Sequence, residues 1–127
     1  MKGKEGKKEM AKQASSEIVK EGERLLARVR GEIDHHSAKP LREGIDHSMR
    51  RERPRVLVLD LGEVSFMDSS GLGFVLGRIA LAEEMDCRVE IRRSSERVLR
   101  ILAMGGIGKI KNAIVCKENE KSERKGG

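Results

Sequence analysis

The feature that most constrains the fold is a long apolar run, RVLVLDLGEVSF (residues 55–66), with a second, amphipathic segment directly behind it. The first four apolar residues of the run are continuous and β-prone, which is typical of a strand buried on both faces of a parallel sheet. The following segment, residues 70–85, places Leu72, Val75, Leu76 and Ile79 at helical spacing. A buried strand that leads straight into a helix predicts an α/β domain.

Strand-like and helix-like segments alternate along the rest of the chain. The expected strands span residues 17–22, 24–33, 55–66, 87–93 and 109–116, and the expected helices span residues 34–52, 70–85 and 94–106. This order predicts an α/β fold with a mixed, mostly parallel sheet and helices packed on it. The predicted core consists of Leu25, Val29, Val56, Val58, Leu59, Leu72, Val75, Leu76, Ile79, Val89, Ile91, Ile101, Leu102 and Ile114.

Local signals define the expected helix ends. In the helix over residues 34–52, Leu41, Ile45 and Met49 lie four apart on one face, and Pro40 is expected in the first turn, where a missing N–H costs nothing. For the helix over residues 94–106, Ser94 or Ser95 is the expected N-cap, and Gly105 or Gly106 is expected at the C-terminal end.

The two ends of the chain differ in composition from the middle. Residues 1–15 and 117–127 are polar and charged, which predicts disordered tails on either side of one domain, residues 16–116. The ends also supply most of the net charge of +6, so residues 13–116 carry only +2. With no Trp, no Tyr and two Phe, the chain lacks the aromatic side chains that nucleic-acid binders use for stacking. No nucleic-acid partner is therefore expected.

The location of the protein is predicted from what the sequence lacks. There is no apolar run near 18 residues, and the N-terminal residues have no apolar core of a secretory signal, so neither a membrane span nor a membrane partner is expected. Cys87 and Cys116 form no CxxC pair, which favours free thiols in a cytoplasmic protein.

The stretch FMDSSGLGF, residues 66–74, lies where the central strand meets the next helix, at the edge of an open α/β sheet where ligands and partners bind. The simplest interpretation is a helix cap: Asp68 or Ser69 accepts the free N–H groups of the first turn, and Gly71 and Gly73 allow close packing. A cap alone does not explain two serines followed by two glycines, which leave a hydroxyl without bulky neighbours.

Two enzymatic interpretations fit less well. A nucleophile elbow requires G-x-S-x-G, and neither Ser69 nor Ser70 has the first glycine. The three histidines, His35, His36 and His47, all lie upstream of both serines. A phosphate-binding loop requires GxxxxGK[ST], which is absent. The adjacent His35 and His36 lack further ligands at metal-binding spacing, so they are interpreted as cap and surface residues, and no metal is expected.

Two motifs together resemble a known family. GEIDHHSA (residues 31–38) and VSFMDSSGLGFVLGR (residues 64–78) closely resemble segments of the STAS-domain anti-anti-sigma factors, especially their sporulation branch. The likeness covers residues 16–115, with the same order of elements. The chain departs from the family at its end: such proteins commonly close with an amphipathic helix, whereas residues 116–127 have no apolar face.

The resemblance implies a binding protein with no active site and no cofactor of its own. In this family, the unphosphorylated protein binds an anti-sigma factor serine kinase, which itself holds ATP, and so releases the sigma factor. Phosphorylation of a serine in the DSSG segment ends the binding, and a phosphoserine phosphatase reverses it. By motif position the acceptor is Ser70, with Asp68, Ser69 and Gly71 as its neighbours.

The partner surface is expected where two strands end and two helices begin, because right-handed crossovers bring these turns to one edge of the sheet. Its expected residues are Glu32, Asp34, His35, His36, Ser65, Met67, Leu72 and Gly73. The alternative is a STAS protein that is not switched, a constitutive regulatory subunit of a transporter or signalling complex. In that protein neither serine would be modified.

Overall fold

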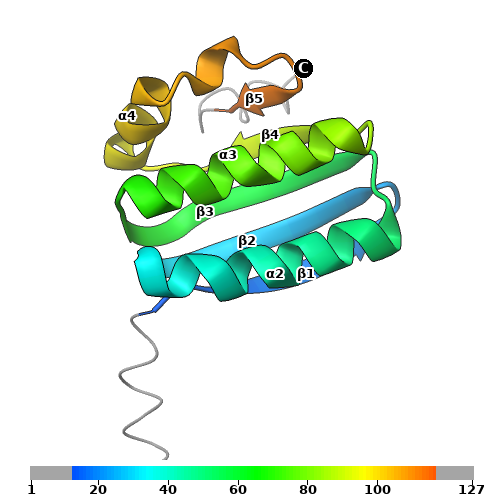
Figure 1. Ribbon diagram of the computed structural model, residues 1–127, viewed down its shortest axis with the longest axis horizontal. Helices are drawn as coiled ribbons and strands as arrows, with labels where there is room; N and C mark the ends of the chain where they lie inside the picture. Colours follow the sequence, from blue (N-terminus) through cyan, green and yellow to red (C-terminus); the bar gives the residue numbers. More distant parts are fainter. Residues whose placement is uncertain (1–12, 117–127) are drawn as a thin grey trace, which may run out of the picture.

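The computed structural model describes residues 13–116, which form one sheet with helices on it (Figure 1). In chain order the elements are β1 (Ser15–Glu21), β2 (Arg24–Ile33), α2 (His35–Glu52), β3 (Val56–Met67), α3 (Ser69–Glu84), β4 (Arg88–Arg92), α4 (Glu96–Met104), the 3-10 turn η1 (Ile107–Lys109) and β5 (Ala113–Val115). The expected tails over residues 1–12 and 117–127, and the expected lack of a closing helix, lie outside the described residues.

The five strands lie in the order β1-β2-β3-β4-β5. β1 is antiparallel to β2, whereas β2 to β5 all run parallel, so the predicted mixed and mostly parallel sheet is confirmed. Each parallel crossover steps one strand in the same direction. Because such crossovers are right-handed, the helices between them gather on one face. Figure 1 shows α2 in front of β1 and β2, and α3 in front of β3 and β4.

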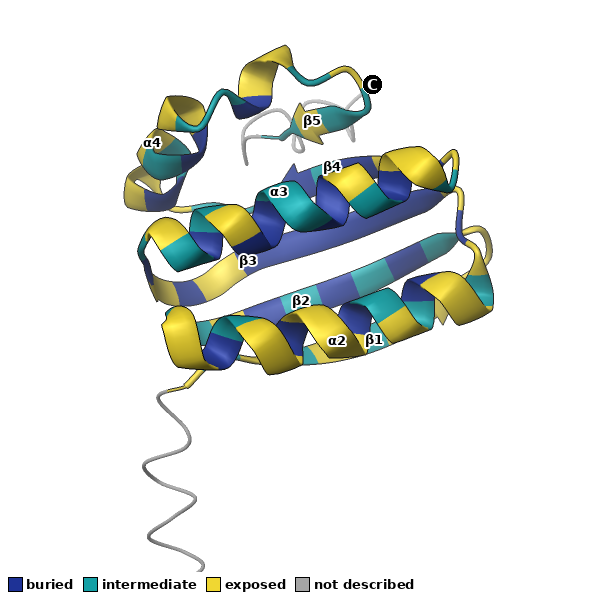
Figure 2. Ribbon diagram, viewed as in Figure 1, coloured by how far each residue is buried: buried dark blue, intermediate teal, exposed yellow. Residues whose placement is uncertain are grey.

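The core lies between the sheet and these helices (Figure 2). Helix α2 buries Leu41, Ile45 and Met49 on one face, as their spacing predicted. Most of the predicted core is confirmed: Leu25, Val29, Val56, Val58, Leu59, Val75, Ile79, Val89, Ile91 and Leu102 are buried. Leu72, Leu76 and Ile101 are partly buried and pack against this cluster. Burial on both sides of β3 is also confirmed, since Val56 to Leu59 are all 9% exposed or less.

The other face of the sheet carries arginine side chains in place of helices. Arg28 of β2 forms ion pairs with Glu17 at 3.6 Å and with Asp60 at 3.7 Å, and Arg92 of β4 pairs with Glu90 at 2.6 Å. Asp60 is only 7% exposed. Long side chains with apolar stems can shield apolar surface while their charged ends stay near water, which accounts for the burial of β3 on this face.

Four expectations require correction. Ile114 is 48% exposed, because it lies on the arginine-bearing face of a short edge strand. The last strand is three residues long, since Ile107–Lys109 form a 3-10 turn. Pro40 lies beyond the first turn of α2, which begins at His35. The domain begins before residue 16, since Ser15 starts β1 and Gln13 already bridges to Glu32.

Candidate functional site

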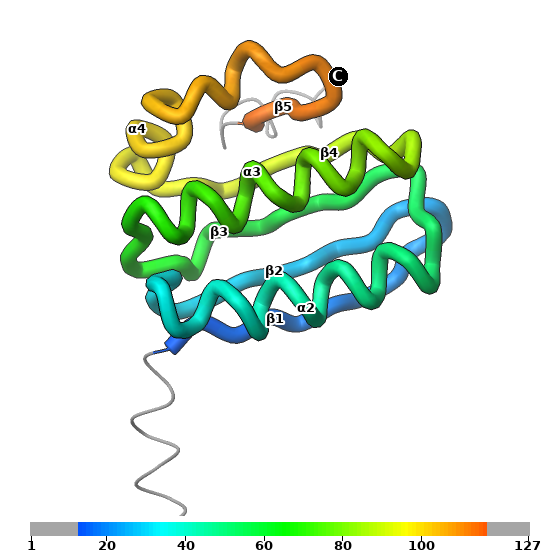
Figure 3. The backbone as a smooth tube through the Cα atoms, viewed as in Figure 1, coloured from blue at the N-terminus to red at the C-terminus, as the bar shows by residue number. Residues whose placement is uncertain are grey.

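The candidate site lies where β2 and β3 end and α2 and α3 begin (Figure 3). The two strands are parallel neighbours, and their last residues, Ile33 and Met67, are paired in the sheet. Asp34 and Asp68 follow these residues directly, and each is the N-cap of its helix. The two expected turns therefore meet at one edge of the sheet, because parallel strands end on the same side.

The start of α2 is closed by a reciprocal set of hydrogen bonds. The carboxylate of Asp34 accepts from the backbone N–H groups of His36 and Ser37, both at 3.0 Å. The hydroxyl of Ser37 accepts from the N–H of Asp34 at 3.0 Å and donates to the carbonyl oxygen of Glu32 at 2.9 Å. Ser37 is 3% exposed. Its hydroxyl is therefore a structural part of a capping box.

The start of α3 has the same aspartate and no such box. The carboxylate of Asp68 accepts from the backbone N–H groups of Ser70 at 2.8 Å and Gly71 at 3.4 Å. Asp68 is thus the cap, which decides between the two expected cap residues. Ser69 is exposed and Ser70 half-buried. Within residues 13–116, neither serine hydroxyl has a hydrogen-bond partner.

The two glycines of the motif have different surroundings. A Cβ at Gly71 would clash with Cγ of Met67, so this position requires glycine for close packing. A Cβ at Gly73 would meet nothing within 4 Å. Gly73 is also exposed, which leaves open space one turn along from the serines. The expected role of glycine in close packing therefore holds at Gly71 and is wrong at Gly73.

Met67 is 2% exposed, so the expectation that it contacts a partner is wrong for this structure. Its pairing with the buried Ile33 turns both side chains inward. The outward residue is Phe66, which is 40% exposed and was missing from the expected surface. β3 has an extra residue where Gly31 pairs with Val64 and Glu32 pairs with Phe66.

This bulge turns Ser65 and Phe66 outward together. A glycine inside a predicted strand is the sequence signal that could have revealed this bulge, because such a glycine often marks an irregular strand pairing. In the structure Gly31 has a φ near 95°.

A buried ion pair fixes the two helices to each other. Nε of Arg78 in α3 lies 2.7 Å from Oδ1 of Asp46 in α2, and Nη2 of Arg78 donates to Oδ2 at 3.3 Å. Nη1 donates to the carbonyl oxygen of Phe74 at 3.3 Å. Burial lowers the pKa of Arg78, and the charge of Asp46 opposes that effect. The hydrophobic pattern of the sequence gave no sign of this contact, which joins the middle of α2 to the middle of α3.

The remaining predicted residues fall into exposed and shielded groups. Glu32, His35 and His36 are exposed, and the two imidazole rings lie edge to face with centroids 5.6 Å apart. Leu72 is half-buried, because its side chain lies against Gly105.

Among residues 13–116, no three His, Cys, Asp or Glu side chains are grouped to hold a metal ion. Both cysteines are free thiols, as expected. In the same part of the chain, no helix is long and apolar enough to cross a membrane.

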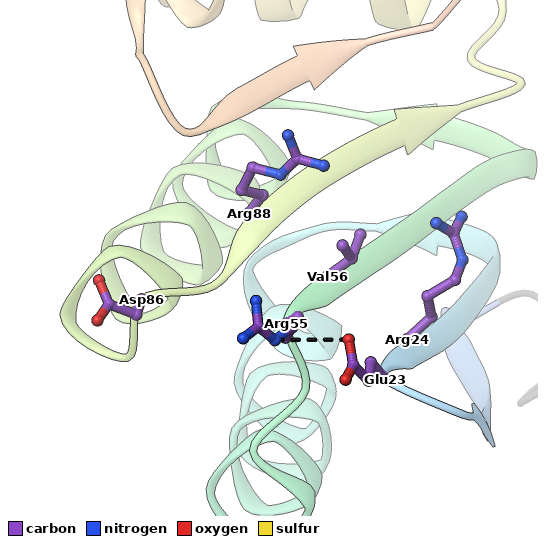
Figure 4. A pocket seen from close by; sticks show the side chains of 6 residues that line it. All are labelled: Glu23, Arg24, Arg55, Val56, Asp86 and Arg88. Carbon is purple, nitrogen blue, oxygen red and sulfur yellow. Dashed lines mark ion pairs between the residues drawn. The ribbon is translucent and has the colours of Figure 1, made fainter.

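A hollow of about 600 Å³ lies at the other ends of the strands, and no predicted site residue lines it (Figure 4). It is lined by Glu23, Arg24, Arg55, Val56, Asp86 and Arg88. Arg55 pairs with Glu23 at 3.4 Å, and Arg24 pairs with Glu90 at 3.2 Å. Two of the three arginines that line the hollow therefore already have a carboxylate partner within the protein.

The chain matches the STAS domain family over residues 15–120. An anti-sigma F factor antagonist of Paenibacillus polymyxa is 37% identical over 86 residues, which are 68% of this chain and 74% of that protein. An anti-sigma-B factor antagonist of Bacillus subtilis is 32% identical over 90 residues, which are 70% of this chain and 81% of that protein.

Two solved structures share the fold over nearly their whole length. The anti-sigma factor antagonist SpoIIAA in its unphosphorylated form has a TM-score of 0.64 at 25% identity, covering 89% of this chain and 99% of that chain. The Bacillus cell fate determinant SpoIIAA in the phosphorylated form has a TM-score of 0.65 at 26% identity, covering 87% and 98%. The chain therefore belongs to the STAS domain family and is similar, within it, to anti-sigma factor antagonists.

Proposed function

We propose that this protein is an anti-sigma factor antagonist, and that phosphorylation of Ser70 switches off its binding to an anti-sigma factor. The observation that carries the proposal is the Ser70 hydroxyl, half-buried and without a hydrogen-bond partner in the described chain, at the first turn of α3. The anti-sigma factor is proposed to be the kinase and to hold the ATP, while a phosphoserine phosphatase restores the hydroxyl. Similarity to antagonists of this kind supports the assignment.

The chemistry of the helix start suits a phosphate at Ser70. The positive end of the helix dipole favours an anion there, so a phosphate is compatible with the fold. The same phosphate adds roughly −1.5 to −2 charges beside Asp68. Asp34 caps the neighbouring helix at the same edge, and the exposed Glu32 precedes it. A partner surface suited to these carboxylates would then face a much larger negative charge.

The proposed contact surface consists of the exposed or half-buried residues around the two helix starts. These are Glu32, Asp34, His35, His36, Ser65, Phe66, Leu72 and Gly73. Phe66 supplies an apolar centre, and its carboxylate and imidazole neighbours supply a polar rim, the usual arrangement of a protein interface. The proposed role for Phe66 replaces the one expected for Met67.

The proposal is tested by measuring the affinity for the anti-sigma factor from the same organism, before and after incubation with ATP. We expect ATP to weaken the binding by about tenfold or more, a change of roughly 1.4 kcal/mol. The Ser70→Ala variant should bind equally well before and after ATP, and should displace the sigma factor in both cases. If ATP has no effect on the wild-type protein and Ser70→Ala binds like it, the alternative of an unswitched STAS subunit holds.

A further inference from the structure

An apolar groove of about 360 Å³ lies between α4, η1 and β5, and no residue of α2 or α3 lines it. Leu102 and Ile107 in its lining are buried, whereas Leu99 and Val115 are half-exposed. Met104, next to the lining residue Ala103, is 83% exposed. The groove therefore leaves aliphatic surface in contact with water, which a partner that covered it would remove from water.

The chain that follows β5 has nothing apolar to place in the groove. Residues 117–127 contain only Lys, Arg, Glu, Asn, Ser and Gly. Filling a groove lined by leucine, isoleucine and valine requires aliphatic or aromatic side chains.

All residues that line the groove lie within residues 97–116, a stretch whose charged side chains are all cationic. Residues 97–116 carry four cations, Arg97, Arg100, Lys109 and Lys111, and no carboxylate. Arg100 lines the groove, and Lys109 follows the lining residue Gly108. Neither Arg100 nor Lys109 has an ion-pair partner within 4 Å among the described residues, unlike Arg28 and Arg92 on the open face of the sheet. The groove thus combines an apolar interior with a basic rim.

We propose that this groove binds a segment of a partner protein that presents aliphatic side chains flanked by carboxylates, as an acidic amphipathic helix does. Such a segment would bury its apolar side chains in the groove and place its carboxylates against Arg100 and Lys109. The lining residues Leu102 and Ile107 are buried, which favours inserted side chains over a flat lipid surface. The inference does not depend on Ser70, since the groove lies on other elements.

The test is titration of the 15N-labelled full-length protein with two synthetic peptides of about 14 residues, roughly four helical turns. Both carry leucine at helical spacing, and the other positions are glutamate in one peptide and lysine in the other. We expect the glutamate peptide to shift the amide signals of Leu99, Leu102, Ala103, Ile107 and Val115, and to bind about tenfold more tightly or better. Added salt should reduce this preference.

Two variants sharpen the test. The double change of Arg100→Glu and Lys109→Glu alters exposed side chains only, so it should leave the fold intact and reverse the peptide preference. Ala103→Glu places a charge in the lining and should abolish binding of the glutamate peptide.

Equal binding of both peptides, or shifts confined to other elements, would overturn the proposal. The same shifts on raising the protein concentration alone would identify the occupant as a second copy and would also overturn the proposal. The same shifts on adding vesicles of phosphatidylcholine and phosphatidylglycerol in equal parts would identify it as a membrane. Displacement of residues 117–127 by the peptide would identify it as the protein's own C-terminal segment.

Discussion

Helices α2 and α3 follow neighbouring parallel strands and begin in the same way, with an aspartate that accepts backbone N–H groups of the first turn. They differ in what happens to the serine that follows. In α2 the hydroxyl of Ser37 is buried and bonded to the N–H of the cap residue Asp34 and to the carbonyl oxygen of Glu32. In α3 the hydroxyls of Ser69 and Ser70 have no partner in the described chain. The serine at the start of α2 thus takes part in the capping hydrogen bonds, whereas the serines at the start of α3 do not use their hydroxyls in the described chain.

This difference shows how a fold can present an unbonded serine hydroxyl at little cost in stability. Asp68 alone satisfies the first N–H groups of α3, so the hydroxyl of Ser70 has no structural task. Under the proposed function, a change at Ser70 alters the partner surface without altering the helix. A change at Ser37 would leave backbone groups of the α2 start unpaired.

The largest expected effect comes from breaking the ion pair that joins the middle of α2 to the middle of α3. Asp46→Ala leaves the buried guanidinium of Arg78 without its carboxylate and should lower the free energy of unfolding by about 3 kcal/mol. Denaturant unfolding measures this loss. The double variant Asp46→Leu with Arg78→Met removes both charges and should regain part of the stability. A loss below about 0.5 kcal/mol for Asp46→Ala would show that the pair does not hold the helices together.

The next effect concerns the two glycines of the α3 start. Gly71→Ala forces its Cβ against Met67, which should cost about 1–3 kcal/mol. Gly73→Ala meets open space within an exposed helical turn and should stabilise the protein by about 0.5–1 kcal/mol. Thermal unfolding of the pair measures both effects. Equal melting temperatures would mean that Met67 moves aside and that Gly71 is not a packing requirement.

Matched alanine variants test whether the hydroxyl of Ser37 stabilises the protein more than the hydroxyl of Ser70 does. Ser37→Ala leaves the N–H of Asp34 and the carbonyl of Glu32 without their partner and should cost about 1–2 kcal/mol. Ser70→Ala removes no hydrogen bond within the described chain and should stay within about 0.5 kcal/mol of the wild-type protein. A shift of about 4–8 °C per kcal/mol makes the contrast visible in melting temperature. The comparison fails if Ser70→Ala is the more damaging change.

The smallest expected effect is the pH dependence of the α2 cap. The pKa of Asp34 is lowered chiefly because the backbone N–H of Ser37 stabilises its carboxylate, while partial burial opposes this and the N–H of His36 adds to it. The resulting stability is present above the unfolded pKa of about 4 and is lost as the pH falls through the lower folded pKa.

Asp34→Asn carries no titratable group at this position. The free energy of unfolding by which this variant falls short of the wild-type protein should therefore shrink below about pH 4. Denaturant unfolding of both proteins from pH 7 down to pH 3 checks this prediction. A stability difference that stays constant over this range would show that the charge of the Asp34 carboxylate does not stabilise the α2 start.

Sequence patterns predicted the elements whose residues depend on local periodicity. The bounds of β2 were predicted correctly, and Leu41, Ile45 and Met49 lie on the buried face of α2. Patterns were weaker where contacts between elements decide the outcome. Simple alternation does not reveal the bulge that exposes Phe66, and an exposed edge strand leaves Ile114 outside the core. The Arg78–Asp46 pair joins residues 32 positions apart, which no local pattern reports.

The candidate site divides in the same way. The two helix starts were placed at one edge of the sheet by strand order and right-handed crossovers, and Asp68 is one of the two cap residues expected for α3. The two histidines interpreted as cap and surface residues at the start of α2 are exposed, and Asp34 is the cap. Which serine is bonded and which is available depends on backbone groups brought together by the fold. The separate roles of Ser37 and Ser70 therefore became visible only in the structure.

The most direct test of the central claim is to map the phosphate after incubation with the anti-sigma factor kinase and ATP, and to measure melting of the modified protein. We expect a single phosphate on Ser70, none on Ser69 or Ser37, and a melting temperature within about 4 °C of the unmodified protein, since roughly 1 kcal/mol or less should separate the two forms. Phosphate on Ser37, or a modified protein that unfolds, would contradict the claim that α3 presents a free serine while α2 uses its serine for structure.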